Sequence, residues 1–276
     1  MPSGTTDECF ERIKTLADLV VRIRVQKTSL ARPENDSLAE YRGSGRLRLG
    51  TGVISYLSQS KSGEICPCLA CDGNVARKHW KFTVHTARHV VYDTQEAKAS
   101  KVDLFYDDQS SRRDGRMQTV RAVEMQYAAS DTDKCIVLCV THDETLAQNI
   151  KCVDQSWQSF CHHHPILNQN VRENAFRILR ELSEGGPVFV VVISHPHGQP
   201  KKVTVGKIVS GAEDSSFNYT TATCPGSSGA PLFLVDSELF TPGFFPWFGY
   251  VHSGTFPEPS HKTRKHINFS NCFVYN

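Results

Sequence analysis

Short apolar runs, each about the length of one β-strand, recur along most of the chain. A first series is separated by turns of Gly, Ser, Asp and charged residues and lies at 19–26, 47–57, 79–87, 101–107, 117–127 and 134–140. A second series lies at 188–194, 201–209, 230–235, 248–254 and 266–275. Short strands at such spacing, with turn signals between them, are typical of β-barrels and β-sandwiches. The pattern predicts two β-lobes.

Two stretches instead follow the period of an α-helix. Apolar residues from Phe10 to Leu19 recur at helical spacing after a threonine and acidic residues, which predicts an amino-terminal helix. Residues 168–186, NQNVRENAFRILRELSEGG, carry one apolar face and end in Gly–Gly, a typical helix stop. We therefore expect a single domain made of an amino-terminal helix, a first β-barrel, a linker with a helix and a second β-barrel, over residues 1–18, 19–140, 141–186 and 187–276.

Composition excludes several classes of protein. Hydrophobic content of 39% and charged content of 22% are typical of a soluble globular chain, and a net charge of +2 gives no overall tendency to bind nucleic acid. The basic runs at 112–116 and 261–266 are expected to be solvated loops. No apolar stretch approaches the ~18–20 residues of a membrane span. We expect neither a nucleic-acid partner nor a membrane.

The amino-terminal residues are acidic and amphipathic, and they lack the apolar core of a signal peptide. We therefore expect a cytoplasmic or nuclear protein, in which thiols stay reduced. The ten cysteines are then core residues or ligands.

Three polar residues lie beside predicted strands. His89 occurs in TARHV, Asp133 opens DKCIVL, and Ser228 lies in GSSGAP. A serine hydroxyl becomes nucleophilic when an imidazole can take its proton and a carboxylate orients that imidazole. The backbone amides of Gly226 and Ser228 can stabilise an oxyanion, and Gly229 keeps bulk away from the hydroxyl. The first two residues belong to the first lobe and the third to the second, so they can meet only between the lobes.

The motifs TA-x-H, D-x-x-φ-φ-L (φ apolar) and G-x-S-G-x-P, in this order over about residues 45–255, resemble those of the chymotrypsin-like (trypsin-fold) serine protease superfamily. The resemblance implies an all-β fold of two six-stranded antiparallel β-barrels and a serine endopeptidase acting on polypeptides. It implies His89, Asp133 and Ser228 as the triad. Asp131 competes for the acid role, but the apolar pair of the motif, Ile136 and Val137, favours Asp133.

Departures from the secreted members point to one branch of that superfamily. Ser227 stands where those members carry an Asp that pairs with a freed amino terminus, and Val90 replaces a cysteine. Cys224 has no cysteine at the expected partner position and is expected to be a free thiol. These absences resemble the intracellular, HtrA-like and viral members. His195 and His197 are expected at the tip of a hairpin.

The resemblance also implies the specificity pocket. Ala222, six before the nucleophile, disfavours Lys or Arg at P1 (the substrate residue before the cleaved bond), and His252, Ser253 and Gly254 match the pocket wall. His252 resembles the pocket histidine of relatives that prefer Glu or Gln; alternatively it packs beneath a pocket for large apolar residues. The alternative function is a catalytically inactive trypsin-fold binding or scaffold module.

A cysteine-rich run, Cys66–Pro–Cys68–x–x–Cys71, has a spacing at which thiolates can bind zinc. A fourth ligand would come from His79, Cys161 or His163. The alternative is a cysteine-bearing hairpin loop without metal. We favour this alternative, and so expect no cofactor.

Overall fold

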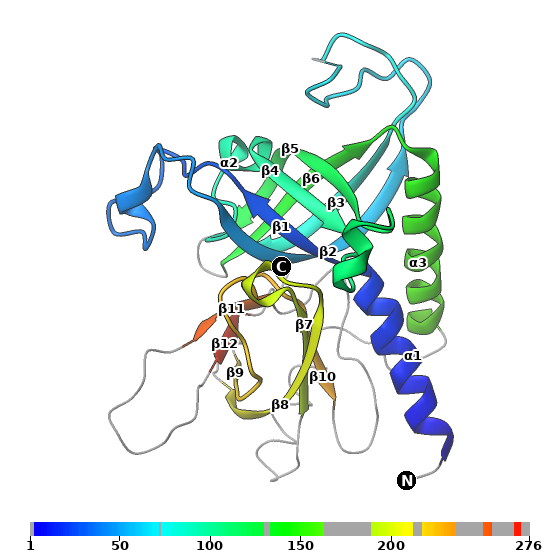
Figure 1. Ribbon diagram of the computed structural model, residues 1–276, viewed down its shortest axis with the longest axis vertical. Helices are drawn as coiled ribbons and strands as arrows, with labels where there is room; N and C mark the ends of the chain where they lie inside the picture. The colour runs from blue at the N-terminus through cyan, green and yellow to red at the C-terminus, as the bar shows by residue number, and fades with distance from the viewer. Residues whose placement is uncertain are drawn as a thin grey trace.

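The computed structural model describes residues 3–71, 73–129, 133–162, 189–211, 217–235, 251–255 and 268–271. The fold is mostly β: a closed barrel lies above a second, curled sheet, and helices run along one side (Figure 1). Between the two β units lies the region where the predicted active site should form.

The first unit is a closed barrel of six antiparallel strands in the order β1-β2-β3-β6-β5-β4, which the pairing of β1 with β4 completes. Its strands are β1 Val20–Val25, β2 Arg48–Gln59, β3 Trp80–Ala87, β4 Ser100–Leu104, β5 Gln118–Ala129 and β6 Lys134–Thr141. Valine, isoleucine and leucine side chains from all six strands form the core. The strand runs expected in the first lobe are confirmed, with ends shifted by a few residues.

The second unit is a six-stranded sheet in the order β10-β7-β8-β9-β12-β11. Its strands are β7 Phe189–Ser194, β8 Lys202–Gly211, β9 Phe217–Tyr219, β10 Leu232–Val235, β11 Val251–Thr255 and β12 Asn268–Asn271. In the described residues it is a half-barrel rather than the second closed barrel expected from the sequence. Among the described residues, its edge strands β10 and β11 are joined by a single bridge, from Pro231 to Val251, whereas the whole of β10 pairs with β7. No pattern of residues predicted β9, which is only three residues long.

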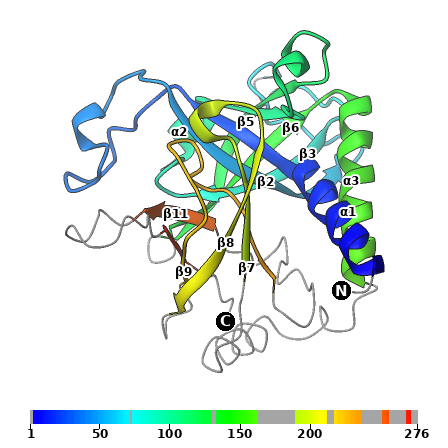
Figure 2. The ribbon, with the colours of Figure 1, turned by 60° about the horizontal axis from the view of Figure 1, so that its bottom comes forward.

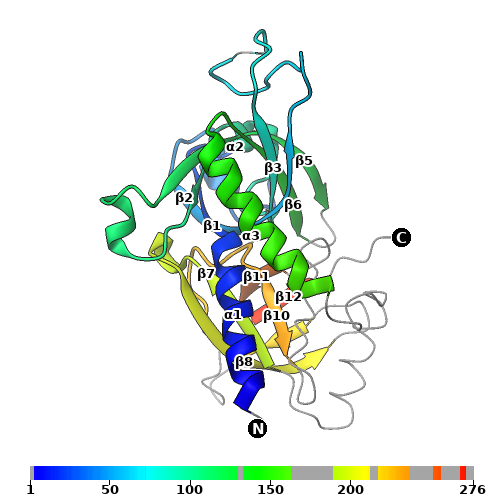
Figure 3. The same cartoon turned by 90° about the vertical axis from the view of Figure 1, so that its right-hand side faces the viewer.

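Two long helices pack against each other on one side of the molecule; the second along the chain lies beside the barrel, and the first extends from the barrel past the second sheet (Figures 2 and 3). The amino-terminal helix is confirmed as α1 Ser3–Leu19, with Leu16 and Leu19 buried in the barrel core. The second helix, α3 Glu144–His162, was not predicted. The helix expected over 168–186 lies outside the described residues. Neither long helix has the apolarity that a bilayer crossing would require, as far as the described chain extends.

A short helix, α2 Thr94–Lys98, follows β3 along the chain. Asp93 caps it, because its carboxylate accepts a hydrogen bond from the amide of Glu96 at 2.9 Å. The cap fixes the start of the helix, and this places the buried Glu96 side chain directly behind the turn that carries His89.

Candidate active site

His89 follows the end of β3, and Asp133 precedes β6, the neighbouring strand. The Nδ1 atom of His89 lies 2.7 Å from Oδ2 of Asp133, and the amide of His89 donates to Oδ1 at 2.9 Å. With Nδ1–H donating to the carboxylate, Nε2 carries the lone pair. The pairing of these two residues, expected from the sequence, is therefore present. The competing Asp131 lies outside the described residues.

A buried ionic network holds the backbone of His89. Arg32 donates to its carbonyl at 3.0 Å, and Arg48 donates to the next carbonyl, that of Val90, at 2.9 Å. Both guanidinium groups also contact the fully buried carboxylate of Glu96, at 2.7 and 2.8 Å. Burial by itself would raise the pKa of Glu96, but the hydrogen bonds from Arg32 and from backbone amides outweigh it and lower the pKa to about 2. Nothing in the local sequence indicated these positioning residues.

The loop that carries Ser228 fits its surroundings only because two of its residues are glycines. Gly226 and Gly229 have φ angles of +98° and +82°, in the region that favours glycine. A Cβ atom on Gly229 would lie 2.2 Å from Oγ1 of Thr86 in β3, and one on Gly226 would lie 2.7 Å from the carbonyl of His195. The loop is therefore pressed against the first barrel.

The backbone amides of this loop fall into two groups. Those of Ser227, Gly229 and Ala230 donate to the carbonyls of Cys224, His252 and Ser227, respectively. Those of Gly226 and Ser228 donate to no acceptor among the described residues. Two free amides, one at the serine and one two residues before it, can stabilise a developing oxyanion.

Thr51 of β2 joins the serine loop to the first barrel. Its amide donates to the carbonyl of Ser228 at 2.8 Å, and its hydroxyl donates to the carbonyl of Gly226 at 2.7 Å. The same hydroxyl accepts from the amide of His195 at 3.0 Å. Its only sequence context was a Gly–Thr–Gly within a strand, so its role was not predicted.

His89, Gly226 and Ser228 line one cavity of about 350 Å³. Its other walls come from the loop before β2 and the start of β2, and include Tyr41 and Leu49. No hydrogen bond joins the hydroxyl of Ser228 to the ring of His89 in the described part of the chain. Such hydrogen bonds are often long without substrate and shorten in the complex.

Ser227 occupies the position before the candidate nucleophile and is fully buried. Its Oγ lies 3.0 Å from Oγ of Ser194 at the end of β7, and it accepts from the amide of Cys224 at 3.3 Å. A neutral hydroxyl pair therefore fills the place where the secreted chymotrypsin-like proteases carry an ion pair. Cys224 is a free, exposed thiol.

Of the residues expected in the specificity pocket, His252 is joined directly to the serine loop: its amide donates to the carbonyl of Ala230, and its carbonyl accepts from the amide of Gly229. His252 is buried, and its Nδ1 lies 2.6 Å from the hydroxyl of Tyr219. Burial, with a smaller effect of the nearby His89, lowers the pKa of His252 to about 4. Ser253 forms a bulge between the paired residues His252 and Gly254 on β11, the outer strand of its sheet. Ala222 is exposed.

His195 and His197 lie in the β7–β8 turn, as expected. His195 is fully buried, with its ring parallel to that of Tyr106 at 5.9 Å, and burial lowers its pKa to about 3. The amide of His197 donates to the carbonyl of Pro225 at 2.6 Å, so the turn supports the serine loop. Arg22 of β1 anchors the turn to the barrel by donating to the carbonyl of Gly198 at 2.6 Å.

The zinc candidates Cys66, Cys68 and Cys71 lie together, and the fourth residue of the group is His142. His142 was not among the expected ligands, and it takes the place expected of His79. His142 follows β6, and the pairing of Trp80 with Thr141 places it beside the end of the β2–β3 loop. His79 packs edge-on against His142 with ring centres 6.0 Å apart, but its Nδ1 is bound to the carbonyl of Arg77. The described side chains include neither Cys161 nor His163.

The closed barrel and the second, half-closed sheet have the arrangement of a trypsin-like fold. No protein-family model and no curated protein matches the chain. Among solved structures, the chain is similar to the serine endoprotease from Yersinia pestis, with a TM-score of 0.47 and 15% identity over 96% of this chain and 62% of that one. It is also similar to the HtrA-type protease AlgW, with a TM-score of 0.47 and 16% identity over 96% of this chain and 59% of that one. The chain thus spans about three fifths of these proteins, and the likeness is distant.

Proposed function

We propose that the protein is a serine endopeptidase in which Ser228 is the nucleophile, His89 the general base and Asp133 the group that orients His89. One observation carries the proposal. An imidazole whose Nδ1 is bound by a carboxylate at 2.7 Å lines the same cavity as a serine in a glycine-shaped loop. This is the set of groups that acyl transfer by serine requires.

The proposed reaction has two halves. Ser228 Oγ attacks the substrate carbonyl while Nε2 of His89 takes its proton, and the amides of Gly226 and Ser228 stabilise the oxyanion. The imidazolium then gives that proton to the leaving amine as the C–N bond breaks, which leaves an ester on Ser228. Water attacks the ester, His89 again moves the proton, and the acid product leaves with the serine restored. Asp133 holds Nδ1 of the ring and stabilises its cationic form.

Substrate would bind in an extended conformation. The outer edge of β11 beyond the Pro231–Val251 bridge pairs with no other described strand, so it can accept a polypeptide in antiparallel pairing. Ala222 places no carboxylate at the base of the P1 pocket, which argues against Lys or Arg there. With the hydroxyl of Tyr219 donating to Nδ1 of His252, Nε2 carries a hydrogen that favours a Glu or Gln side chain. The alternative is that His252, which is buried, only packs beneath a pocket for a large apolar P1 residue.

A fluorophosphonate probe tests the nucleophile. We expect one labelled serine in the wild-type protein, no label in Ser228→Ala, and a rate of labelling at least roughly 10³-fold lower in His89→Ala. Ser227→Ala is the matched control, since it removes the neighbouring hydroxyl and should still be labelled. Label that persists in Ser228→Ala would contradict the assignment. Cleavage of a peptide library then separates Glu or Gln from large apolar P1 residues.

A binding or scaffold module is the second candidate, favoured by the missing hydrogen bond between Ser228 and His89. It predicts a folded wild-type protein that takes no label, cleaves no peptide in the library, and binds a polypeptide equally well as Ser228→Ala.

We further propose that the protein works in a reducing compartment, cytoplasmic or nuclear. Seven described cysteines are free, among them the buried Cys135 and Cys139 of β6, and this supports the proposal. Fractionation of the native cells, with an antibody to the chain, tests it. Recovery from an oxidising compartment would contradict it.

A further inference from the structure

We propose that Cys66, Cys68, Cys71 and His142 form a structural zinc site that holds the β2–β3 loop against the first barrel. This site is separate from the candidate active site. The eight residues of β3, from Trp80 beside the cluster to Ala87 near His89, place roughly 20 Å of strand between them. Figure 1 shows the loop projecting from the end of the barrel that faces away from the second sheet.

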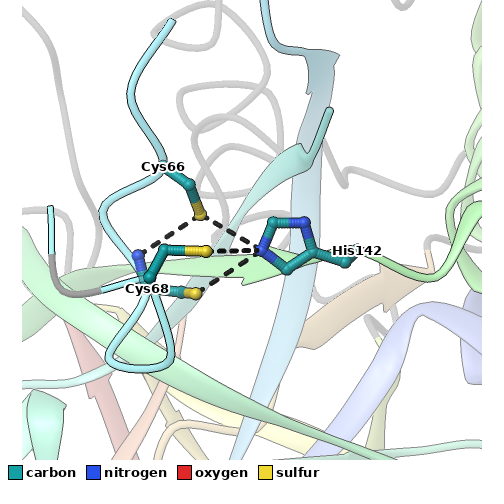
Figure 4. A group of neighbouring side chains, drawn as sticks. Cys66, Cys68 and His142 are labelled. Carbon is teal, nitrogen blue, oxygen red and sulfur yellow. Dashed lines mark hydrogen bonds between the residues drawn. The ribbon is translucent and has the colours of Figure 1, made fainter. Parts of the chain in front are cut away.

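The distances fit one tetrahedral ion. The Sγ atoms of Cys66, Cys68 and Cys71 lie 3.3, 3.5 and 3.5 Å from Nε2 of His142, and all four ligand atoms lie within 4.8 Å of one another (Figure 4). With Zn–S about 2.3 Å and Zn–N about 2.0 Å, a tetrahedral site requires sulfur-to-nitrogen separations of about 3.5 Å. The side chains therefore already surround a volume of the right size.

The tautomer of His142 also suits a metal. Its Nδ1 lies 2.8 Å from the carbonyl of Lys78 and donates to it, which leaves the lone pair on Nε2 facing the three sulfurs. The amide of Cys68 donates to Sγ of Cys66 at 3.5 Å, an interaction that stabilises a thiolate. These outer contacts fix the orientation of the His142 ring and lower the free-energy cost of bringing three thiolates together.

In the part of this loop that the structure describes, the cluster supplies the buried side chains. Among the described residues from 61 to 78, only Cys66 and Cys71 are buried, whereas Ile65, Leu69 and Val75 are 55%, 52% and 47% exposed. The two cysteines pack with Val123, Leu138 and Val140 of the barrel, which is a small contact for so long a loop. Ordering a long loop is costly, and zinc bound by two buried and two half-buried ligands would strengthen this contact.

The ligand set selects the ion and its role. Three thiolates and one imidazole favour zinc over oxygen-seeking cations such as Ca²⁺ or Mg²⁺. Four protein ligands leave no open position for water or substrate, which is typical of a structural rather than a catalytic site. The ion would join the loop to the junction of β6 and α3, where Lys78 and Glu144 also form an ion pair at 2.8 Å.

Metal content tests the proposal on the full, untagged chain purified without added metal. We expect about one zinc per chain by elemental analysis. Cobalt exchanged into the site should give thiolate-to-metal charge-transfer absorption and tetrahedral d–d bands. A strong chelator should expose three further thiols to a thiol reagent and lower the melting temperature.

Matched variants locate the ion. Cys68→Ser, at the least buried cysteine of the group, and His142→Ala should each lower bound zinc at least roughly tenfold. Cys152→Ser, at an exposed cysteine of α3, should keep it. Ser228→Ala should also keep the zinc, so the test of the zinc site does not depend on the proposed peptidase activity.

The wild-type measurement decides the question even if the ligand variants fail to fold. Wild-type protein with less than about 0.1 metal ion per chain, and with thiols equally reactive before and after chelation, would overturn the proposal. So would an intact mass lower by two hydrogens and no metal, which would reveal a disulfide. Zinc retained in both ligand variants would place the ion elsewhere and overturn it as well.

Discussion

The amide of Thr51, in the first barrel, donates to the carbonyl of Ser228, in the second β unit, at 2.8 Å. The threonine hydroxyl adds bonds to the carbonyl of Gly226 at 2.7 Å and to the amide of His195 at 3.0 Å. The position of the candidate nucleophile relative to His89 is therefore set by direct contact between the two units. Rigid placement of this kind is what a triad divided between two lobes needs.

Replacing Thr51 with valine should impair activity more than it impairs binding. Thr51→Val keeps the amide bond but leaves two buried backbone groups without the hydroxyl, which costs about 1–3 kcal/mol of stability. We expect kcat for a peptide substrate to fall about tenfold or more while KM changes less. Urea unfolding and steady-state kinetics measure the two effects. Thr51→Ser is the matched control because it retains the hydroxyl, and equal loss in both variants would contradict the interpretation.

Glu96 should be essential to the stability of the turn that carries His89. Its fully buried carboxylate binds Arg32 and Arg48, and breaking a buried ion pair by removing one partner costs roughly 3–5 kcal/mol. We expect Glu96→Gln to lower the free energy of unfolding by an amount of this order. Asp114→Asn, which breaks an exposed pair with Arg116, should change the free energy of unfolding far less, because solvent screens that pair. Similar losses in the two variants, by chemical denaturation, would count against the network.

Most strands could be predicted because their signal is local. β-branched and apolar residues bounded by turns mark β1 to β8, and no later contact is needed to identify them. The helix α3 escaped prediction because its buried face is narrow: among the side chains the structure describes on it, only Leu146, Ala147 and Ile150 are buried. The half-barrel could not be foreseen because closure depends on how far β10 pairs with β11.

The pairing of His89 with Asp133 could be predicted because the motifs that carry these two residues are short and ordered. The residues that position this pair and the serine loop could not, since each acts over a long sequence separation. Arg32 and Glu96 are 64 residues apart, and Thr51 and Gly226 are 175 apart. His142 joins the three cysteines only because β6 pairs with β3.

A charge at position 227 should destabilise the protein instead of activating it. Ser227 is fully buried against Ser194, and no described cation faces it. Ser227→Asp would bury a carboxylate without a partner, so we expect a loss of several kcal/mol, whereas Ser227→Ala should cost about 1 kcal/mol. Thermal unfolding of the two variants measures the difference. A stable and more active Ser227→Asp protein would imply a cation that approaches this position.

Acid should unfold the protein because three buried histidines are neutral in the folded state. Burial lowers the pKa of His85 to about 3, with a smaller effect of Lys134, and burial lowers those of His195 and His252 to about 3 and about 4. In the unfolded chain these rings take up protons below about pH 6.5. The unfolded state therefore binds more protons than the folded state between pH 6.5 and 4, and stability falls as the pH decreases through this range.

The slope of the free energy of unfolding against pH follows from the number of protons that the chain takes up on unfolding. Three histidines protonated only on unfolding remove about 4 kcal/mol per pH unit once the pH is well below 6.5. Glu96, with its pKa lowered to about 2, adds a further loss as the pH falls below about 4.5. Urea unfolding at pH 7.5, 6.5, 5.5 and 4.5 measures the slope, and His85→Gln should reduce it by about a third, whatever its effect at neutral pH. A wild-type stability that stays constant from pH 6.5 to 5 would mean that these rings are already charged or exposed in the fold.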